Sequence, residues 1–254
     1  MTSPRRIVPC LLLSGSGLVK TRRFSAPQYL GDAVNAVRIF NDCEADELIL
    51  LDIHVCRRAM APRYELIAEI VSEAFMPVCY GGGVTSVEQV RTLFRLGVEK
   101  VAICSSAMEN PGIVRESSRA FGSQSIVGVV EVRKKLFGGF ECHYQAGRKK
   151  SRLDPVTVAR NFEAAGAGEI LVNNIDRDGE MTGYDIDLMV SVCEAVNIPV
   201  IACGGAGKMD HIRELFEKTE TRAAAAGSLF VFHGPHRGVL INYPTPAEIK
   251  AVQN

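Results

Sequence analysis

Two glycine-rich turns lie half a chain apart in this 254-residue sequence. The first is YGGGV at 80–84 and the second is CGGAG at 203–207, so Gly204 lies 123 residues after Gly81. Each turn follows a short apolar run and precedes a stretch with helical spacing of its apolar residues. A glycine turn before a helix leaves backbone N–H groups free at the positive end of the helix dipole, which suits phosphate. The pair of turns predicts a ligand with a phosphate at each end, or a second site retained from an ancestral duplication.

The repeat extends beyond the glycines. Asp52 and Asp176 are 124 residues apart, and Glu47 and Glu169 are 122 residues apart. The segment AICSS at 102–106 corresponds to AAGSL at 225–229. Because all these matches fall in nearly one register, we expect two halves, about 1–122 and 123–254.

Between these points, short apolar runs alternate with helical patterns. One such pattern, at 63–74, places its apolar residues three and four apart on one face. Eight strand–helix units in about 250 residues match a parallel (β/α)8 TIM barrel. A doubly wound open sheet would use similar units, but the half-chain repeat favours closure of a single-domain barrel. The eight runs are at 7–13, 48–53, 77–80, 101–103, 126–132, 170–174, 199–202 and 223–226.

Composition limits the partners. Hydrophobic residues make up 47% of the chain and the formal net charge is zero, so we expect a large core and no nucleic-acid or membrane partner. No apolar run approaches a membrane span, and no signal-peptide pattern is present, which predicts a cytoplasmic protein. The eight cysteines form no C-x-x-C pair and the histidines show no ligand spacing. We therefore expect free thiols, no metal and no cofactor.

Carboxylates near the predicted strand ends are the candidate catalytic groups. Barrel enzymes carry their chemistry on this face, and Asp52, Asp176 and Asp178 lie at or just beyond strand ends. Glu131 ends the fifth strand and could act as a general base if partly desolvated. Aspartates here also serve Asx-turns and helix caps, and that alternative stays open. The first strand carries only leucines at 11–13, so no acid–base pair spans the barrel mouth.

The candidate phosphate-binding residues follow the glycine turns. A single turn of this kind also serves helix–strand packing, whereas the symmetric set favours phosphate. The set comprises Gly82, Gly83, Ser105, Gly204, Gly205, Gly227 and Ser228.

Four charged residues stand just before apolar runs, at the opposite face: Arg6, Glu47, Lys100 and Glu169. Polar residues at the base of a barrel usually serve stability. Two cations and two anions at fourfold positions could instead form a ring of salt bridges closing the central axis. Such a ring would be a gate for a small molecule.

The sequence resembles the cyclase subunit of imidazole-glycerol-phosphate synthase over essentially its whole length. The resemblance implies a glutaminase docked on the lower face and ammonia crossing a gate of the four charged residues. It also implies travel of ammonia along the barrel axis to a phosphorylated substrate contacted by Lys20 and Asp52. The shared stretches are at 6–10, 17–20, 45–48, 51–53, 81–83, 121–124, 166–170, 176–179 and 201–207.

The departures from that family concern its chemistry. Histidine-pathway cyclases need an aspartate near the end of strand one and another on strand five, where this chain has Leu12 and Glu131. Leucine cannot transfer a proton, so the cyclase reaction should be lost. An asparagine–threonine pair is replaced by Cys104–Ser105, and a serine by Cys203.

The segments at 9–13, 227–234 and 236–244 look like those of cyclase-like paralogues from bacterial surface-polysaccharide clusters. Resemblance to these implies a part in acetamidino-sugar synthesis, supplying ammonia to a separate amidotransferase that acts on a nucleotide-activated sugar. Basic stretches at 20–23, 133–135 and 148–152 could bind an anionic substrate or this third enzyme, or could be ordinary solvated charge.

Three functions stay open at this stage. The favoured one is an ammonia-conducting subunit in acetamidino-sugar synthesis. The second is a histidine-pathway cyclase, against which Leu12 argues. The third is a non-catalytic scaffold that activates the glutaminase.

Overall fold

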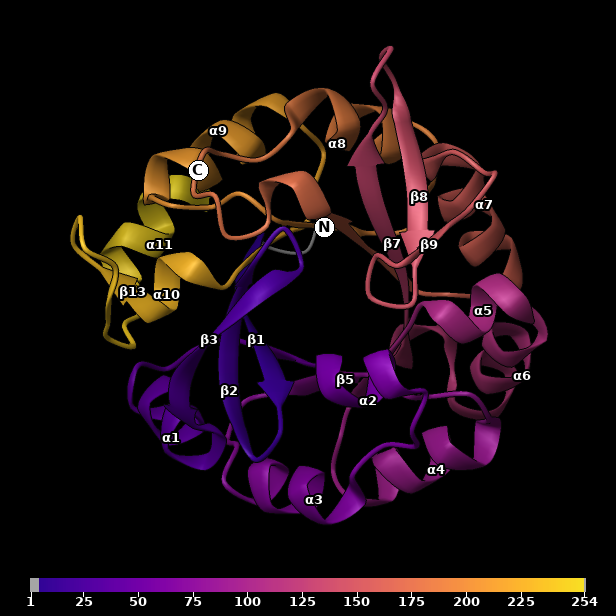
Figure 1. Ribbon diagram of the computed structural model, residues 1–254, viewed down its shortest axis with the longest axis horizontal. Coiled ribbons are helices and arrows are strands. Elements are labelled where there is room, and N and C mark those ends of the chain that lie inside the picture. Colours follow the sequence, from indigo (N-terminus) through magenta and orange to yellow (C-terminus); the bar gives the residue numbers. More distant parts are fainter. Residues whose placement is uncertain (1–4, 254) are drawn as a thin grey trace.

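Eight parallel strands close into a barrel surrounded by helices in the computed structural model, which describes residues 5–253 (Figure 1). The hydrogen-bonded order is β10-β11-β12-β1-β4-β5-β6-β7, and pairing of β7 with β10 closes the ring. This confirms the predicted (β/α)8 barrel. The barrel strands are β1 (Arg6–Ser14), β4 (Leu48–Asp52), β5 (Val78–Gly81), β6 (Lys100–Ile103), β7 (Ile126–Lys134), β10 (Glu169–Asn174), β11 (Val200–Cys203) and β12 (Ala223–Ala226).

Helices follow the strands, and their boundaries reflect local sequence. Asp154 caps α7 and Pro155 lies in its first turn, whereas Pro111 directly precedes α6. The helices are α1 (Ala33–Asp42), α2 (Ile53–Arg58), α3 (Tyr64–Ser72), α4 (Val87–Arg95), α5 (Ser105–Glu109), α6 (Gly112–Phe121), α7 (Pro155–Ala165), α8 (Ile186–Cys193), α9 (Met209–Lys218), α10 (Ser228–Val231) and α11 (Pro246–Gln253), with short 3-10 turns η1 (Ser123–Ser125) and η2 (Ile175–Arg177).

Alternation along each strand separates two cores. On β1, Ile7, Leu11 and Leu13 pack outward beneath the helices, while Val8 and Cys10 point into the barrel. The period of two in a strand makes this division. The inner core is therefore a column of small apolar side chains and thiols: Val8, Cys10, Ile49, Cys79, Ala102, Val127, Val129, Leu171, Ile201, Cys203, Ala223 and Ala225.

Extra strands rise from the carboxyl ends of two barrel strands. After β1, the antiparallel strands β2 (Gly17–Arg22) and β3 (Ser25–Asp32) form a hairpin. After β7, β8 (Phe140–Tyr144) and β9 (Lys149–Lys150) extend the sheet, and the β7–β8 hairpin reaches past the ring of helices (Figure 1). A separate small hairpin joins β13 (Phe232–His233) and β14 (Gly238–Val239). The basic stretches at 20–23, 133–135 and 148–152 thus lie largely on hairpin strands, because the chain doubles back there instead of leaving the sheet.

No helix within residues 5–253 is long and apolar enough to span a membrane. The division into halves stays a prediction, and the outer ends of the two halves, at 1 and 254, lie outside the described residues.

Candidate functional site

A cavity of about 360 Å³ opens at the carboxyl ends of the barrel strands. Strand register brings residues from both halves of the chain to this one end, as parallel closure requires. Every residue proposed for phosphate binding lines it, together with Leu12 and four of the five residues proposed for catalysis or substrate contact. The lining residues from the predicted set are Leu12, Lys20, Asp52, Gly82, Gly83, Ser105, Glu131, Asp178, Gly204, Gly205, Gly227 and Ser228.

The two glycine turns have backbone conformations that need glycine. Gly82 has φ +137° and Gly205 has φ +119°. A Cβ on Gly82 would lie 2.7 Å from the Asp52 carbonyl oxygen, and one on Gly205 would lie 2.0 Å from the Gly183 carbonyl oxygen. The packing alternative therefore holds for these positions whether or not phosphate binds.

The two serines of the predicted phosphate sites differ in their hydrogen bonding. The Ser105 hydroxyl accepts from the Gln145 N–H at 2.9 Å. The Ser228 hydroxyl is buried and lacks a hydrogen-bond partner within residues 5–253. An orphaned buried hydroxyl in a cavity wall is a group that a ligand could satisfy.

The Asp52 carboxylate is bound by backbone N–H groups at the start of α2 and by the side chain of Arg63, the residue just before α3. Its carboxylate accepts from the N–H groups of His54 at 3.0 Å and Val55 at 3.2 Å, which caps α2. Arg63 donates two further bonds to Oδ2, at 2.7 and 2.9 Å. The carboxylate is 0% exposed. The helix-cap interpretation left open for this residue is therefore its observed geometry.

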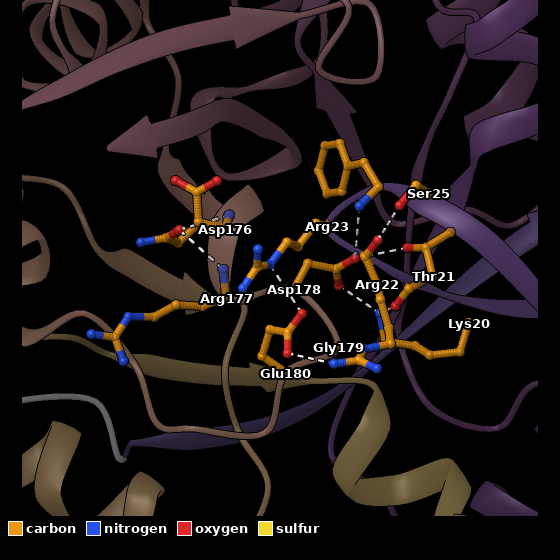
Figure 2. A network of polar contacts seen from close by, with 12 residues as sticks. Lys20, Thr21, Arg22, Arg23, Ser25, Asp176, Arg177, Asp178, Gly179 and Glu180 are labelled. Carbon is orange, nitrogen blue, oxygen red and sulfur yellow. Dashed lines mark hydrogen bonds and ion pairs between the residues drawn. The ribbon is translucent and has the colours of Figure 1, made fainter. Parts of the chain in front are cut away.

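Asp178 is joined to the β2–β3 hairpin, as Figure 2 shows. Its carboxylate forms an ion pair with Lys20, accepts from the Thr21 hydroxyl at 2.7 Å and from the Phe24 N–H at 3.4 Å. Lys20 and Asp178 are both buried. A substrate that uses either charge must compete with this pair or bind beside it.

Asp176 does not join the site. Its side chain accepts from the Lys134 N–H at 2.8 Å and is absent from the cavity lining. Figure 2 shows its carboxylate turned away from Asp178 and Lys20. The structure therefore does not bring the predicted catalytic Asp176 into the cavity: η2 turns the chain between Asp176 and Asp178 and sends the two carboxylates in different directions.

Glu131 is the cavity carboxylate without an ion pair in the part of the chain that the structure describes. One oxygen accepts from the Gly147 N–H at 2.9 Å. Burial raises the pKa of Glu131 to about 7, and the Gly147 hydrogen bond offsets part of that effect. A carboxyl group titrating near neutrality can both give and take a proton.

Two further residues of the cavity wall carry no charge: Leu12 on β1, across the ring from Glu131 on β7, and Cys104, which follows the neighbouring strand β6. Leu12 points inward from β1 beside Leu51 of β4, and its residue is 9% exposed. Burial holds the pKa of Cys104 well above its ordinary value, so its thiol stays protonated. The cavity floor is therefore apolar at Leu12 and Leu51, on β1 and β4.

The four charged residues at the base form one closed ring of ion pairs. Arg6 contacts Glu47 and Glu169, and Lys100 contacts the same two carboxylates at 3.0 and 2.9 Å. Burial opposes the charge on Lys100, but attraction to Glu169 and Glu47 outweighs it and raises the pKa of Lys100. The same balance raises the pKa of Arg6. Both cations therefore stay charged at neutral pH, and the ring lies directly beneath the apolar inner column.

Two residues of the site, Asn173 and Arg63, were not predicted from the sequence. Asn173 lines the cavity from β10, beside Glu131 in the strand register. Counting in steps of two from Glu169 through Leu171 would have found it. Arg63 pairs with Asp52 across a helix and a loop, and no local sequence signal marks that contact.

Comparison with known proteins agrees with this geometry. Residues 6–236 match the family described as histidine biosynthesis protein. A protein of Pseudomonas aeruginosa with the provisional name imidazole glycerol phosphate synthase subunit is 50% identical over 240 residues, covering 94% of this chain and 96% of that one. A similarly named protein of Vibrio vulnificus is 47% identical over 96% of this chain and 95% of its own length. Another, from Leptospira borgpetersenii, is 42% identical over 97% and 98%. The chain therefore belongs to the histidine biosynthesis protein family, as a HisF-like subunit of the imidazole glycerol phosphate synthase family.

Proposed function

We propose that this barrel accepts ammonia from a glutaminase docked on its lower face and conducts it to the upper cavity. The observation that carries the proposal is the closed ring of Arg6, Glu47, Lys100 and Glu169 beneath a column of small apolar and thiol side chains. A neutral molecule the size of ammonia suits such a column, whereas an ion would lose its hydration there.

The ammonia is used for acetamidino modification of a nucleotide-activated sugar in surface-polysaccharide synthesis, by a separate amidotransferase. Supporting this are the cyclase-like resemblance and the lack of an acid–base partner for Glu131 across the cavity, where Leu12 stands. Phosphate groups of the ligand would bind at the glycine turns, with Ser228 as a free hydroxyl.

The ring is tested by coupling. Lys100→Ala and Glu169→Ala should change the ratio of amidated sugar formed to glutamine hydrolysed in the reconstituted system, because each leaves an unpaired charge or a permanent opening. Glu73→Ala is the matched control, since Glu73 pairs with Arg38 on the exposed surface. An unchanged ratio in both ring variants would rule the gate out.

The histidine-pathway alternative is tested directly. The purified chain should not convert the cyclase substrate, even with saturating ammonium salt, because Leu12 can neither give nor take a proton. Appreciable product would restore the cyclase assignment. A non-catalytic scaffold would instead accelerate glutamine hydrolysis by the partner while both ring variants leave the coupling ratio intact.

A further inference from the structure

On the neighbouring strands β7 and β10, the inward-facing side chains change from apolar to polar at the same height in the barrel. From the base upward, β7 presents Val127, Val129 and then Glu131, while β10 presents Glu169 of the ring, Leu171 and then Asn173. Glu131 and Asn173 are register partners. They are the first polar side chains on these strands above the apolar column.

The other strands supply no charge at this level. The residues that line the cavity at this level are Leu12 on β1, Leu51 on β4, Gly81 on β5, Cys104 after β6, Gly205 after β11 and Gly227 after β12. Lys20 also lines the cavity, but its ammonium group forms an ion pair with Asp178. A molecule leaving the column therefore meets one carboxylate and one amide.

Both of these groups have unused acceptors. Glu131 Oε2 takes the Gly147 N–H, and Oε1 has no donor within the described chain. Asn173 is 6% exposed, and its Oδ1 has no hydrogen-bond partner in residues 5–253. The Asn173 oxygen is a buried acceptor without a donor, which is costly unless a ligand supplies one, and the free oxygen of Glu131 belongs to a side chain that lines the cavity.

We propose that Glu131 and Asn173 form a binding site for ammonium at the upper end of the barrel interior. Ammonium has four N–H donors in a tetrahedral arrangement, so one ion can serve the carboxylate and the amide oxygen together. Its positive charge compensates a carboxylate that lacks an ion-pair partner.

Glu131 also exchanges a proton with the bound nitrogen. Ammonia that reaches protonated Glu131 takes the carboxyl proton, which gives ammonium paired with the carboxylate. The proton returns to Glu131 when the nitrogen departs as ammonia, so atoms and charge balance over the cycle. The choice of ammonium over another small N–H cation rests on the proposed function, whereas the acceptor pair itself does not.

The test uses the full-length chain alone, with ¹⁵N-ammonium chloride as the probe and its ¹⁵N relaxation as the readout. Addition of protein should enhance relaxation in a saturable manner, and equal concentrations of tetramethylammonium, which has no N–H group, should not displace the ion. Glu131→Gln should lower the affinity at least tenfold. Glu109→Gln is the matched control, because that cavity carboxylate already pairs with Lys149.

A second variant is expected to bind more tightly, a result that a misfolded protein could not give. Asn173→Asp keeps the side-chain shape and adds a second charge, so it should tighten ammonium binding at pH 8. Unchanged affinity in both Glu131→Gln and Asn173→Asp, or equal displacement by tetramethylammonium, would overturn the site. Neither glutaminase nor sugar is present, so this result is independent of the coupling experiment.

Discussion

Glu131 carries a carboxyl group whose pKa lies near neutrality because burial disfavours its charged form. The folded protein therefore binds a proton more tightly than the unfolded chain, in which a glutamate titrates near 4.5. Between pH 4.5 and about 7 the folded state holds more protons, so the free energy of unfolding falls as pH rises through this window. The loss is at most about 3 kcal/mol, since one pKa unit corresponds to about 1.4 kcal/mol.

Glu131→Gln removes this titration. We expect the variant to gain stability relative to the wild type as pH rises from 5 to 8, and urea unfolding at several pH values measures it. A wild-type-minus-variant difference that stays constant with pH would contradict the assigned burial effect.

The effect of replacing Ser228 on stability should depend on whether phosphate is present. Its hydroxyl is buried without a partner, so Ser228→Ala should leave stability unchanged or raise it by about 1 kcal/mol in phosphate-free buffer. With phosphate present, the wild type should gain more in melting temperature than the variant, because ligand binding stabilises the folded state by mass action. Equal phosphate gains in both proteins would show that this hydroxyl does not contact phosphate.

At the scale of elements, the β2–β3 hairpin is fastened to the turn after β10. Asp178 binds Lys20 and Thr21, and Glu180 of the same turn pairs with Arg22 and Arg23 (Figure 2). The first of these contacts is buried and the Glu180 pairs are more exposed. The buried pair therefore dominates the attachment, because solvent screens the outer one.

Asp178→Ala would leave Lys20 buried without its partner. Breaking a buried pair this way costs about 3–5 kcal/mol. We expect faster amide hydrogen exchange in β2 and β3, measured by mass spectrometry, with little change in α6, which leads into β7 across the ring from β1. Glu73→Ala, which breaks a surface pair, is the control. Unchanged protection of the hairpin would show that backbone pairing alone holds it.

At the scale of the whole molecule, closure joins the first half to the second at two seams. One seam is β6 with β7 and the other is β12 with β1. The ring of ion pairs crosses between the halves as well, since Glu169 contacts both Arg6 and Lys100. Each half alone would expose two strand edges and an apolar inner face.

The predicted division can be tested by cutting there. Residues 1–122 and 123–254, produced separately, should self-associate, because their edges seek partners. Produced together, they should elute as one species of the full-length size in size-exclusion chromatography. Failure of the co-produced halves to combine would contradict the half-barrel boundary.

The sequence alone determined the barrel, the glycine turns and the ring of charges. These features repeat with fixed periods: strands alternate in steps of two, and parallel closure puts every strand end on one face. Arg6, Glu47, Lys100 and Glu169 could be placed together because each directly precedes an apolar run. Their position at or just before the start of a strand thus predicted them without any knowledge of contacts.

The tertiary structure alone decided where the carboxylates lie and which partners they contact. Asp176 and Asp178 are equally plausible in sequence, but only Asp178 reaches the cavity wall and finds Lys20. Asp52 is occupied by Arg63, and Glu131 is left without an ion pair. The direction of a turn and the partner of a charge depend on chain segments far away in sequence. Local pattern cannot encode them, because the free energy of a buried charge is set by whichever groups closure brings beside it.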